Sequence, residues 1–158
     1  SCPSCYRTWK EHYDTPIELR HTTEYIHELI QGERLRLKPL DPLRVAYHDS
    51  CDLGRHGGVY NAPRKIIQSI PGVTLVELEH NRAGSLCCGG GGNLEMAAPE
   101  LAGKLAKAKI EEIQQSGADV VVTACQQCVR TIATSARRQR LALRIMDITE
   151  LVVTALAV

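Results

Sequence analysis

The seven cysteines of this chain fall into tight groups, and this grouping limits what the chain can fold into. They are Cys2 and Cys5, Cys51, Cys87 and Cys88, and Cys125 and Cys128. A secreted domain held by disulfides normally has an even number of more widely scattered cysteines. An odd number in tight groups is typical of metal ligands, because several thiolates must reach one centre. We therefore expect a fold that brings separate segments to one metal site.

Short apolar runs between the cysteines alternate with helical patterns. The sequence predicts strands at 43–47, 73–78, 119–124 and 143–146, and helices at 62–69, 99–115 and 149–157. Because parallel strands need crossover connections, this order indicates an α/β fold with a mainly parallel four-stranded sheet flanked by helices. Sites in such sheets lie at the C-terminal strand ends, and Cys51 and Cys125 each follow a predicted strand.

Composition narrows the class of protein. The chain has 158 residues with 44% hydrophobic content, enough for one full domain. A net charge of +1 and a pI near 7.6 give no support for binding to nucleic acid or to an anionic membrane. There is no apolar run of membrane-spanning length, no signal-peptide pattern and no nucleotide-binding glycine motif. We therefore expect a cytoplasmic protein.

The start of the chain repeats a pattern found near its end. Residues 2–8 and 125–131 share the spacing Cys-x-x-Cys-x-Arg-Thr, and a Thr-Glu pair follows at 23–24 and at 149–150. We infer that residues 1–36 are the C-terminal tail of a preceding copy of the same domain. Residues 37–42 are then a linker, and residues 43–158 form one complete domain.

Five cysteines form the candidate metal-binding set: Cys51, Cys87, Cys88, Cys125 and Cys128. Adjacent side chains in a strand point to opposite faces, so the Cys87–Cys88 pair must lie in an irregular loop to serve one site. Glycines 89–92 supply that freedom and let backbone N–H groups of Gly89 and Gly90 approach sulfur. Five thiolates exceed the four ligands of a structural zinc ion. A lone Cys-x-x-Cys motif would indicate buried structural thiols or a redox disulfide as readily as a metal site, whereas all five cysteines with the glycine loop favour the metal site.

Other polar residues near these cysteines have two interpretations each. His48 is expected either to donate to a cluster sulfur or carry protons, or to cap a strand end. Basic side chains between Cys51 and Cys87 either face the site or lie on the solvated surface, which is the favoured interpretation; they are Arg55, His56, Arg64, His80 and Arg82. The sequence assigns no catalytic residue.

Together these motifs carry a resemblance to a known family. Cys51, the Cys87-Cys88-Gly89 run and the Cys125-x-x-Cys128 motif, with Tyr47-His48-Asp49 before the first cysteine, resemble the cysteine-rich CCG domain. That family includes the B-type and D-type components of heterodisulfide reductase and the iron–sulfur subunits of glycolate oxidase and related oxidoreductases. Ser50 departs from the proline that many members have at this position.

The resemblance implies an iron–sulfur cluster, [4Fe–4S] and in some members noncubane, held by the five cysteines. Cys2 and Cys5 would then belong to the site of the preceding copy. The implied function is electron transfer in a heterodisulfide-reductase-like oxidoreductase, to a disulfide, a quinone pathway or a partner centre. Implied partners are ferredoxin-like or flavoprotein donors, through which the protein associates peripherally with a membrane. The alternatives are a zinc-bound structural domain and a thiol–disulfide redox protein.

Overall fold

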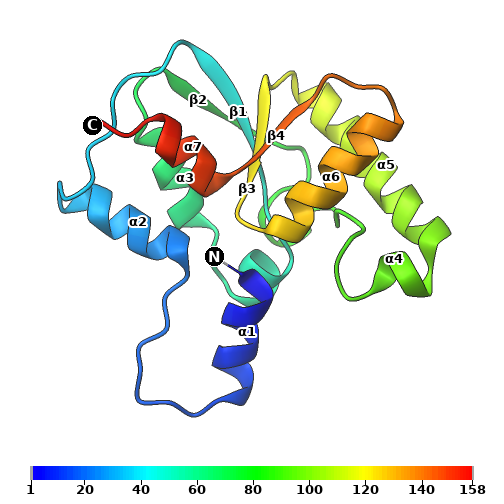
Figure 1. Ribbon diagram of the computed structural model, residues 1–158, viewed down its shortest axis with the longest axis horizontal. Coiled ribbons are helices and arrows are strands. Elements are labelled where there is room, and N and C mark those ends of the chain that lie inside the picture. The colour runs from blue at the N-terminus through cyan, green and yellow to red at the C-terminus, as the bar shows by residue number, and fades with distance from the viewer. Residues whose placement is uncertain (1, 158) are drawn as a thin grey trace.

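The computed structural model describes residues 2–157 as a central sheet with helices on both faces (Figure 1). The strands are β1 (Leu43–His48), β2 (Val73–Glu77), β3 (Val120–Thr123) and β4 (Arg144–Asp147). They lie in the order β2-β1-β3-β4, and every neighbouring pair is parallel. The α/β class and the four-stranded parallel sheet predicted from the sequence are confirmed.

Helices cover the two faces of the sheet unequally (Figure 1). Their bounds are α1 Pro3–His12, α2 Thr22–Gln31, a π-helical turn η1 Asp52–His56, α3 Asn61–Gln68, a 3-10 turn η2 Arg82–Gly84, α4 Leu94–Ala97, α5 Pro99–Ser116, α6 Gln126–Arg138 and α7 Ile148–Thr154. Helices α2, α3 and α7 lie on one side, and α5 and α6 on the other. The last helix is shorter than predicted. Among the described residues, no helix is long and apolar enough to cross a membrane.

Alternation along the strands divides the core in two. Val45 and Tyr47 pack into the hydrophobic core between the sheet and helices α3 and α7. Ala46 packs into the second hydrophobic core, between the sheet and helices α5 and α6. Such alternation follows from the two-residue period of a strand, and burial on both faces is typical of a parallel sheet. Three cysteines pack within the second core, namely Cys88, Cys125 and Cys128. The expected metal site therefore lies on the α5–α6 side of the sheet.

The pairing of β1 with β3 decides where the candidate residues meet. His48 is paired with Thr123, so both strands end at the same edge of the sheet. The chain runs from β1 outward to β2 and then crosses to the other side of β1, which makes the β1–β3 gap the topological switch point. Cys51 and Cys125 follow these two strands and lie at that edge.

The N-terminal segment packs against the core. Tyr6 of α1 and Ile26 and Ile30 of α2 contact the core on the α3–α7 side. Backbone hydrogen bonds join the segment 36–38 to the C-terminal residues 155–157, and Leu37 pairs with Leu156. Both α2 and α7 begin with a capping box, closed by Glu24 and Glu150 respectively. The matching caps support the internal repeat, while the division into two copies stays a prediction.

Helix α5 carries a buried ion pair. Lys109 is fully buried, and its Nζ lies 2.5 Å from Glu112 Oε2. Glu112 Oε1 accepts a hydrogen bond from the His80 backbone N–H at 2.7 Å. Burial acts to raise the pKa of Glu112, but Lys109 and the His80 donor more than offset this and lower the pKa below its ordinary 4.5. The pair thus ties α5 to the loop after β2.

Replacing Glu112 tests this pair. In Glu112→Gln the ammonium of Lys109 stays buried without a counter-charge, so the free energy of unfolding should fall by about 3 kcal/mol. Urea unfolding at neutral pH measures the loss. Glu111→Gln is the matched control, because Glu111 is exposed and lies 3.8 Å from exposed Lys107. The control should stay within about 0.5 kcal/mol of the wild type, and equal losses in the two variants would contradict the assignment.

The same pair predicts a pH dependence. Because the folded-state pKa of Glu112 is lowered, its stabilisation is fully present above the ordinary pKa of 4.5 and is lost as the pH falls through the folded-state value. The stability difference between the wild type and Glu112→Gln should therefore shrink as unfolding is measured at pH values below 4.5. A difference that grows on acidification would have the wrong sign.

Candidate metal centre

Two candidate cysteines are positioned by the strand ends. Cys51 directly precedes η1, three residues after β1, and Cys125 is the N-cap of α6, two residues after β3. Cys128 lies in the first turn of α6, and the backbone N–H of Val129 bonds to the Cys125 carbonyl at 3.0 Å. The first turn of a helix brings residues three apart onto the same face. The Cys-x-x-Cys motif thereby presents both thiols to the switch point.

The Cys87–Cys88 pair lies in a loop without regular secondary structure, as its sequence predicts. The Gly89 backbone N–H donates to Cys87 Sγ at 3.3 Å. Gly89 has φ of +85°, and a Cβ there would lie 2.5 Å from the Ala102 carbonyl oxygen of α5. Only glycine allows this backbone turn and this close approach. The loop is thus pressed against α5 while its cysteines face the sheet edge.

The five thiols are close enough to change each other's ionisation. Hydrogen bonding to Cys128 and Cys87 holds the pKa of Cys88 well below its ordinary value. The hydrogen bond with Cys88 raises the pKa of Cys87, and those with Cys125 and Cys88 raise the pKa of Cys128. Burial raises the pKa of Cys51. The hydrogen bond from the Cys128 thiol lowers the pKa of Cys125. Such opposed shifts mean that the thiols share protons, because adjacent thiolates repel each other.

His48 adds a nitrogen donor to this group. Its side chain is 1% exposed and helps to lower the pKa of Cys88, yet neither ring nitrogen makes a hydrogen bond of normal geometry among the described residues. One ring nitrogen lies within 4.8 Å of the sulfurs of Cys88 and Cys128. A buried imidazole without partners is costly and calls for an explanation. A bound group between the cysteines would supply the missing partner.

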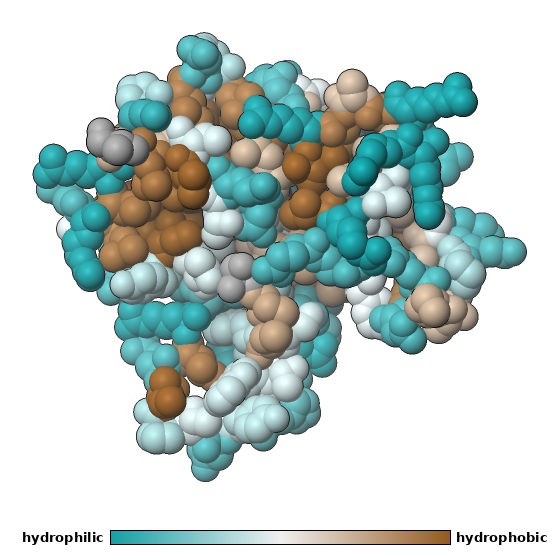
Figure 2. Space-filling view, viewed as in Figure 1, coloured by the Kyte–Doolittle hydropathy of each residue, from teal (hydrophilic) through white to brown (hydrophobic). Residues whose placement is uncertain are grey.

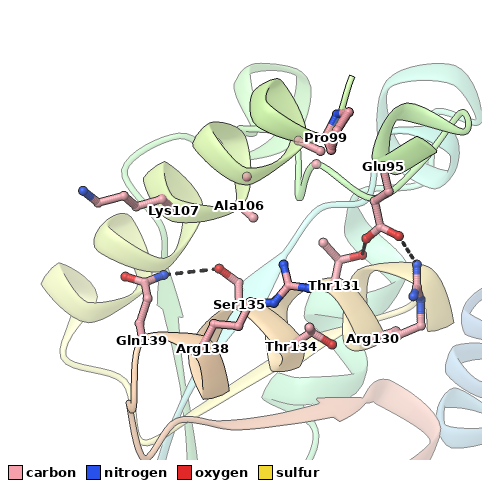
Figure 3. A pocket seen from close by; sticks show the side chains of 13 residues that line it. Glu95, Pro99, Ala106, Lys107, Arg130, Thr131, Thr134, Ser135, Arg138 and Gln139 are labelled. Atoms are coloured by element: carbon pink, nitrogen blue, oxygen red, sulfur yellow. Dashed lines mark hydrogen bonds and ion pairs between the residues drawn. The ribbon is translucent and has the colours of Figure 1, made fainter. Parts of the chain in front are cut away.

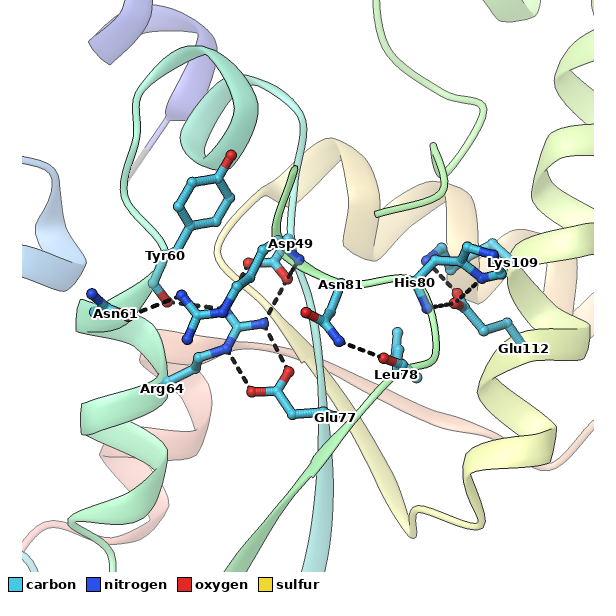
Figure 4. A network of polar contacts seen from close by, with 11 residues as sticks. Asp49, Tyr60, Asn61, Arg64, Glu77, Leu78, His80, Asn81, Lys109 and Glu112 are labelled. Atoms are coloured by element: carbon cyan, nitrogen blue, oxygen red, sulfur yellow. Dashed lines mark hydrogen bonds and ion pairs between the residues drawn. The ribbon is translucent and has the colours of Figure 1, made fainter. Parts of the chain in front are cut away.

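A buried arginine network lies behind the site (Figure 4). Arg64 donates two hydrogen bonds of 2.7 Å to Asp49 and two of 2.7 and 2.8 Å to Glu77, and it stacks over the Tyr47 ring at 5.2 Å. Its side chain is only 4% exposed. The expectation that Arg64 lies on the solvated surface is therefore wrong, because pairing of β1 with β2 brings both carboxylates to it.

Asp49 also holds the loop that leads to the cysteine pair. Its carboxylate accepts the Arg82 backbone N–H at 2.7 Å. Arg55, in η1, donates to the carbonyl oxygens of Ala83 and Ser85 at 2.9 and 3.0 Å. Sequence reasoning missed Asp49, although its position next to His48 and before Cys51 was a usable signal. The turn after Cys51 and the loop before Cys87 are consequently fixed to each other.

The remaining candidate residues near the cysteines are His56, His80 and Arg82. His56 and the side chain of Arg82 are exposed, in line with a surface position. His80 is about half exposed and bonds to Glu112. Within residues 2–157, the hydrogen bonds of the His80 and Arg82 side chains go to Glu112 and Asn61 and not to a cysteine. The expected surface position is confirmed for His56 and Arg82.

Cys2 and Cys5 form a separate pair at the start of α1. Cys2 is the N-cap of this helix, and its Sγ accepts the Cys5 backbone N–H at 3.4 Å. Helix α1 approaches the site through Asp52, the residue after Cys51, which accepts from Ser4 at 2.5 Å and from Arg7 at 3.2 Å. Cys2 and Cys5 therefore occupy the N-cap and the first turn of α1, as Cys125 and Cys128 do in α6.

Comparisons with known proteins identify the family to which the chain is similar. The profile of the cysteine-rich domain family CCG matches residues 45–133, which include all five clustered cysteines. The chain is 33% identical, over 99% of its length, to the D component of the dihydromethanophenazine:CoB–CoM heterodisulfide reductase of Methanosarcina barkeri. It is 34% identical over 94% of its length to the probable iron–sulfur-binding oxidoreductase FadF of Bacillus subtilis. It is 36% identical over 95% to the B component of the CoM/CoB fumarate reductase of Methanothermobacter marburgensis.

The chain spans only part of each of these relatives. It covers 40% of the heterodisulfide reductase component, 22% of FadF and 30% of the fumarate reductase component. The shared region contains the sheet edge and the cysteines described above.

The glycine loop offers a matched pair of substitutions. A Cβ at Gly90 would overlap Thr131 Oγ1 and lie 2.8 Å from Gln127 Nε2, whereas a Cβ at Gly91 would meet nothing within 4 Å. Gly90→Ala should therefore displace the loop and lower the free energy of unfolding by about 1–3 kcal/mol, while Gly91→Ala should change it by less than about 0.5 kcal/mol. Chemical unfolding of the metal-free chain decides, and similar values for the two would refute the packing described.

Arg64 is tested by a substitution that keeps its charge. Lysine cannot form the two bidentate pairs with Asp49 and Glu77, so Arg64→Lys should destabilise the fold by about 2 kcal/mol. Arg82→Lys is the control, since exposed Asn61 is the only acceptor of the Arg82 side chain within the described part of the chain. The control should be nearly neutral in thermal and urea unfolding. A neutral Arg64→Lys would show that the network does not stabilise the site.

Proposed function

Since this chain belongs to the cysteine-rich CCG family, we propose that it binds an iron–sulfur cluster and is the electron-transfer module of an oxidoreductase. The observation that carries the proposal is the meeting of five thiols from three segments at one sheet edge. The residues proposed to hold the cluster are Cys51, Cys87, Cys88, Cys125 and Cys128. When bound, such a cluster accepts and releases single electrons.

The donor set suits an iron–sulfur cluster. Thiolates are soft ligands that favour such clusters, and the positive charge of iron would let these mutually repelling thiols ionise together. His48 is placed to donate from its unpartnered ring nitrogen to a cluster sulfur. The Gly89 N–H already donates to Cys87 Sγ. Hydrogen bonds of this kind to sulfur tune the potential of a cluster.

The type of cluster is a finer proposal. A cubane [4Fe–4S] cluster uses four cysteine ligands, and this site offers five. The surplus thiol favours a noncubane [4Fe–4S] arrangement, in which all five take part. Cys51 and Cys87 are the two members that are only partly buried. They form the side of the site from which an electron donor or acceptor has access.

The wider role follows from the relatives by analogy. Two of them are named as reductase subunits and one as an iron–sulfur-binding oxidoreductase. We propose that the module relays electrons from a ferredoxin-like or flavoprotein partner to a disulfide, a quinone pathway or another centre. It would act in the cytoplasm, reaching a membrane only through its partners. Cys2 and Cys5 would belong to the site of a preceding copy of the domain.

One observation favours a second candidate, a zinc-bound structural domain. A ring nitrogen of His48 and the sulfurs of Cys88 and Cys128 all lie within 4.8 Å of one another. Mixed sulfur and nitrogen sets of this kind bind zinc in structural sites. In that case the module would contribute to assembly and would not carry electrons.

Anaerobic reconstitution with iron and sulfide distinguishes the two. The proposed cluster predicts a brown protein that contains iron and acid-labile sulfide and gives an EPR signal in one oxidation state. Cys88→Ser should abolish or strongly alter that signal, because the Cys88 thiol is hydrogen-bonded to those of both Cys87 and Cys128. Cys5→Ser, which changes an exposed thiol of α1, is the control and should leave the signal unchanged.

Three results would count against the proposal or against its ligand assignment. A colourless protein with about one zinc per chain and no sulfide would establish the structural alternative. A metal-free protein whose Cys125–Cys128 pair titrates reversibly as a dithiol would instead indicate a thiol–disulfide protein. An EPR spectrum unchanged by Cys88→Ser would remove that residue from the ligand set.

A further inference from the structure

A groove lies between α5 and α6, outside the cysteine site (Figure 3). Its volume is about 440 Å³, which is within the range of small-molecule sites. At one end it reaches Gly89, the residue that follows the cysteine pair. At the other end it reaches Arg138 and Gln139, where α6 ends. The groove therefore runs along α6 from the cluster loop to the end of the helix.

The two walls of the groove differ in chemistry. Helix α5 contributes small residues, Ala102, Gly103 and Ala106, while α6 contributes the hydroxyl groups of Thr131 and Ser135. Helices that pack against each other normally fill the contact with apolar side chains. Here small residues face hydroxyl groups and the space between them stays open. One wall suits an apolar body, and the other suits hydrogen-bond acceptors.

The groove carries surplus positive charge. Its lining includes three cationic side chains and one carboxylate, that of Glu95, which is paired with Arg130. Among the residues that the structure describes, the one ion-pair partner of Lys107 is exposed Glu111, at 3.8 Å. Arg138 has no hydrogen bond or ion pair among residues 2–157. Hydrophilic side chains gather over α6 in the space-filling view (Figure 2).

We propose that this groove binds a small organic anion, with its oxyanion group at Arg138 and Ser135 and a short apolar body against Ala102 and Ala106. Figure 3 shows Thr131, Ser135 and Arg138 on the α6 side of the groove, facing α5. Arginine presents several donors in one plane and therefore recognises carboxylates and phosphates. The binding does not depend on the cluster.

The groove is joined to the cluster loop by hydrogen bonds. Gln127 Nε2 donates to the Gly90 carbonyl at 2.9 Å and to Thr131 Oγ1 at 3.2 Å. Thr131 is a wall residue of the groove and also donates to Glu95 at 3.2 Å. A ligand whose body extends along this wall from Arg138 and Ser135 would contact Thr131. Binding in the groove is thereby linked to the loop that carries Cys87 and Cys88. This link, unlike the binding itself, rests on the proposed function of these cysteines as cluster ligands.

Calorimetry and NMR on the 158-residue chain test the site. The probes are hexanoate, succinate and inorganic phosphate, with hexanol as the neutral analogue. Hexanoate should bind saturably and hexanol should not, and a comparison with phosphate separates the contribution of the oxyanion from that of the apolar body. Arg138→Gln should weaken binding about tenfold, equivalent to 1.4 kcal/mol. Ala106→Leu should block the groove.

Arg137→Gln is the matched control, because it removes the same charge from the neighbouring position, which does not line the groove. It should bind hexanoate as the wild type does. Equal weakening in Arg137→Gln and Arg138→Gln would reduce the effect to net charge and overturn the proposal. The proposal would also be overturned if none of the three anions bound saturably, or if Ala106→Leu bound hexanoate as the wild type does.

The link to the cluster loop has its own readout. Hexanoate should shift the amide resonances of glycines 89–92, and Thr131→Val should reduce these shifts while circular dichroism shows the variant folded. Binding without any shift of these amides would overturn the link while leaving the site itself in place. Because these measurements use the metal-free chain, their failure is distinguishable from failure of cluster binding.

Discussion

Parallel pairing of β1 with β3 is the constraint on which the candidate site depends. It sets His48 opposite Thr123, so the two segments that follow, the η1 turn and the first turn of α6, emerge at one edge. Antiparallel pairing would send Cys51 and Cys125 to opposite ends of the sheet. The pairing is stabilised by β-branched residues of β3 that are buried on both faces. The cysteines of two distant segments thus meet because of the core beneath them.

The third segment, which carries Cys87 and Cys88, does not directly follow a strand. Hydrogen bonds from charged side chains fix its position instead. The loop before Cys87 is held by Arg55 and by Asp49, which is itself fixed by buried Arg64. The loop after Cys88 is held by the contact of Gly89 with α5 and by the bond from Gln127 to Gly90. Anchors on both sides restrict the irregular loop to one path. A site built from a loop needs such support if its ligands are to keep a fixed geometry.

The sequence predicts most of the sheet but not the charged network. Strands such as 119–124 are visible as β-branched runs, and their order with the helices determines the parallel class. Arg64 looks like a surface residue because its partners, Asp49 and Glu77, meet it only after β1 and β2 pair. Lys109 and Glu112 likewise resemble an exposed helical pair, since spacing alone does not reveal burial. The groove beside α6 depends on how two helices approach each other, which no local pattern encodes.

The position of the cysteines within an apolar core has an electrostatic consequence. Cys88, Cys125 and Cys128 pack with residues such as Ile110 and Ile132, so charge placed on their sulfurs is poorly solvated. Adding an electron to a cluster held there would raise that cost, unless nearby donors compensate. The donors within reach are the His48 ring and backbone N–H groups: that of Asp52 at Cys51, that of Gly89 at Cys87, and those of Gln127 and Cys128 at Cys125. The potential of the proposed cluster would therefore depend strongly on the N–H groups and the imidazole that this fold places around its ligands.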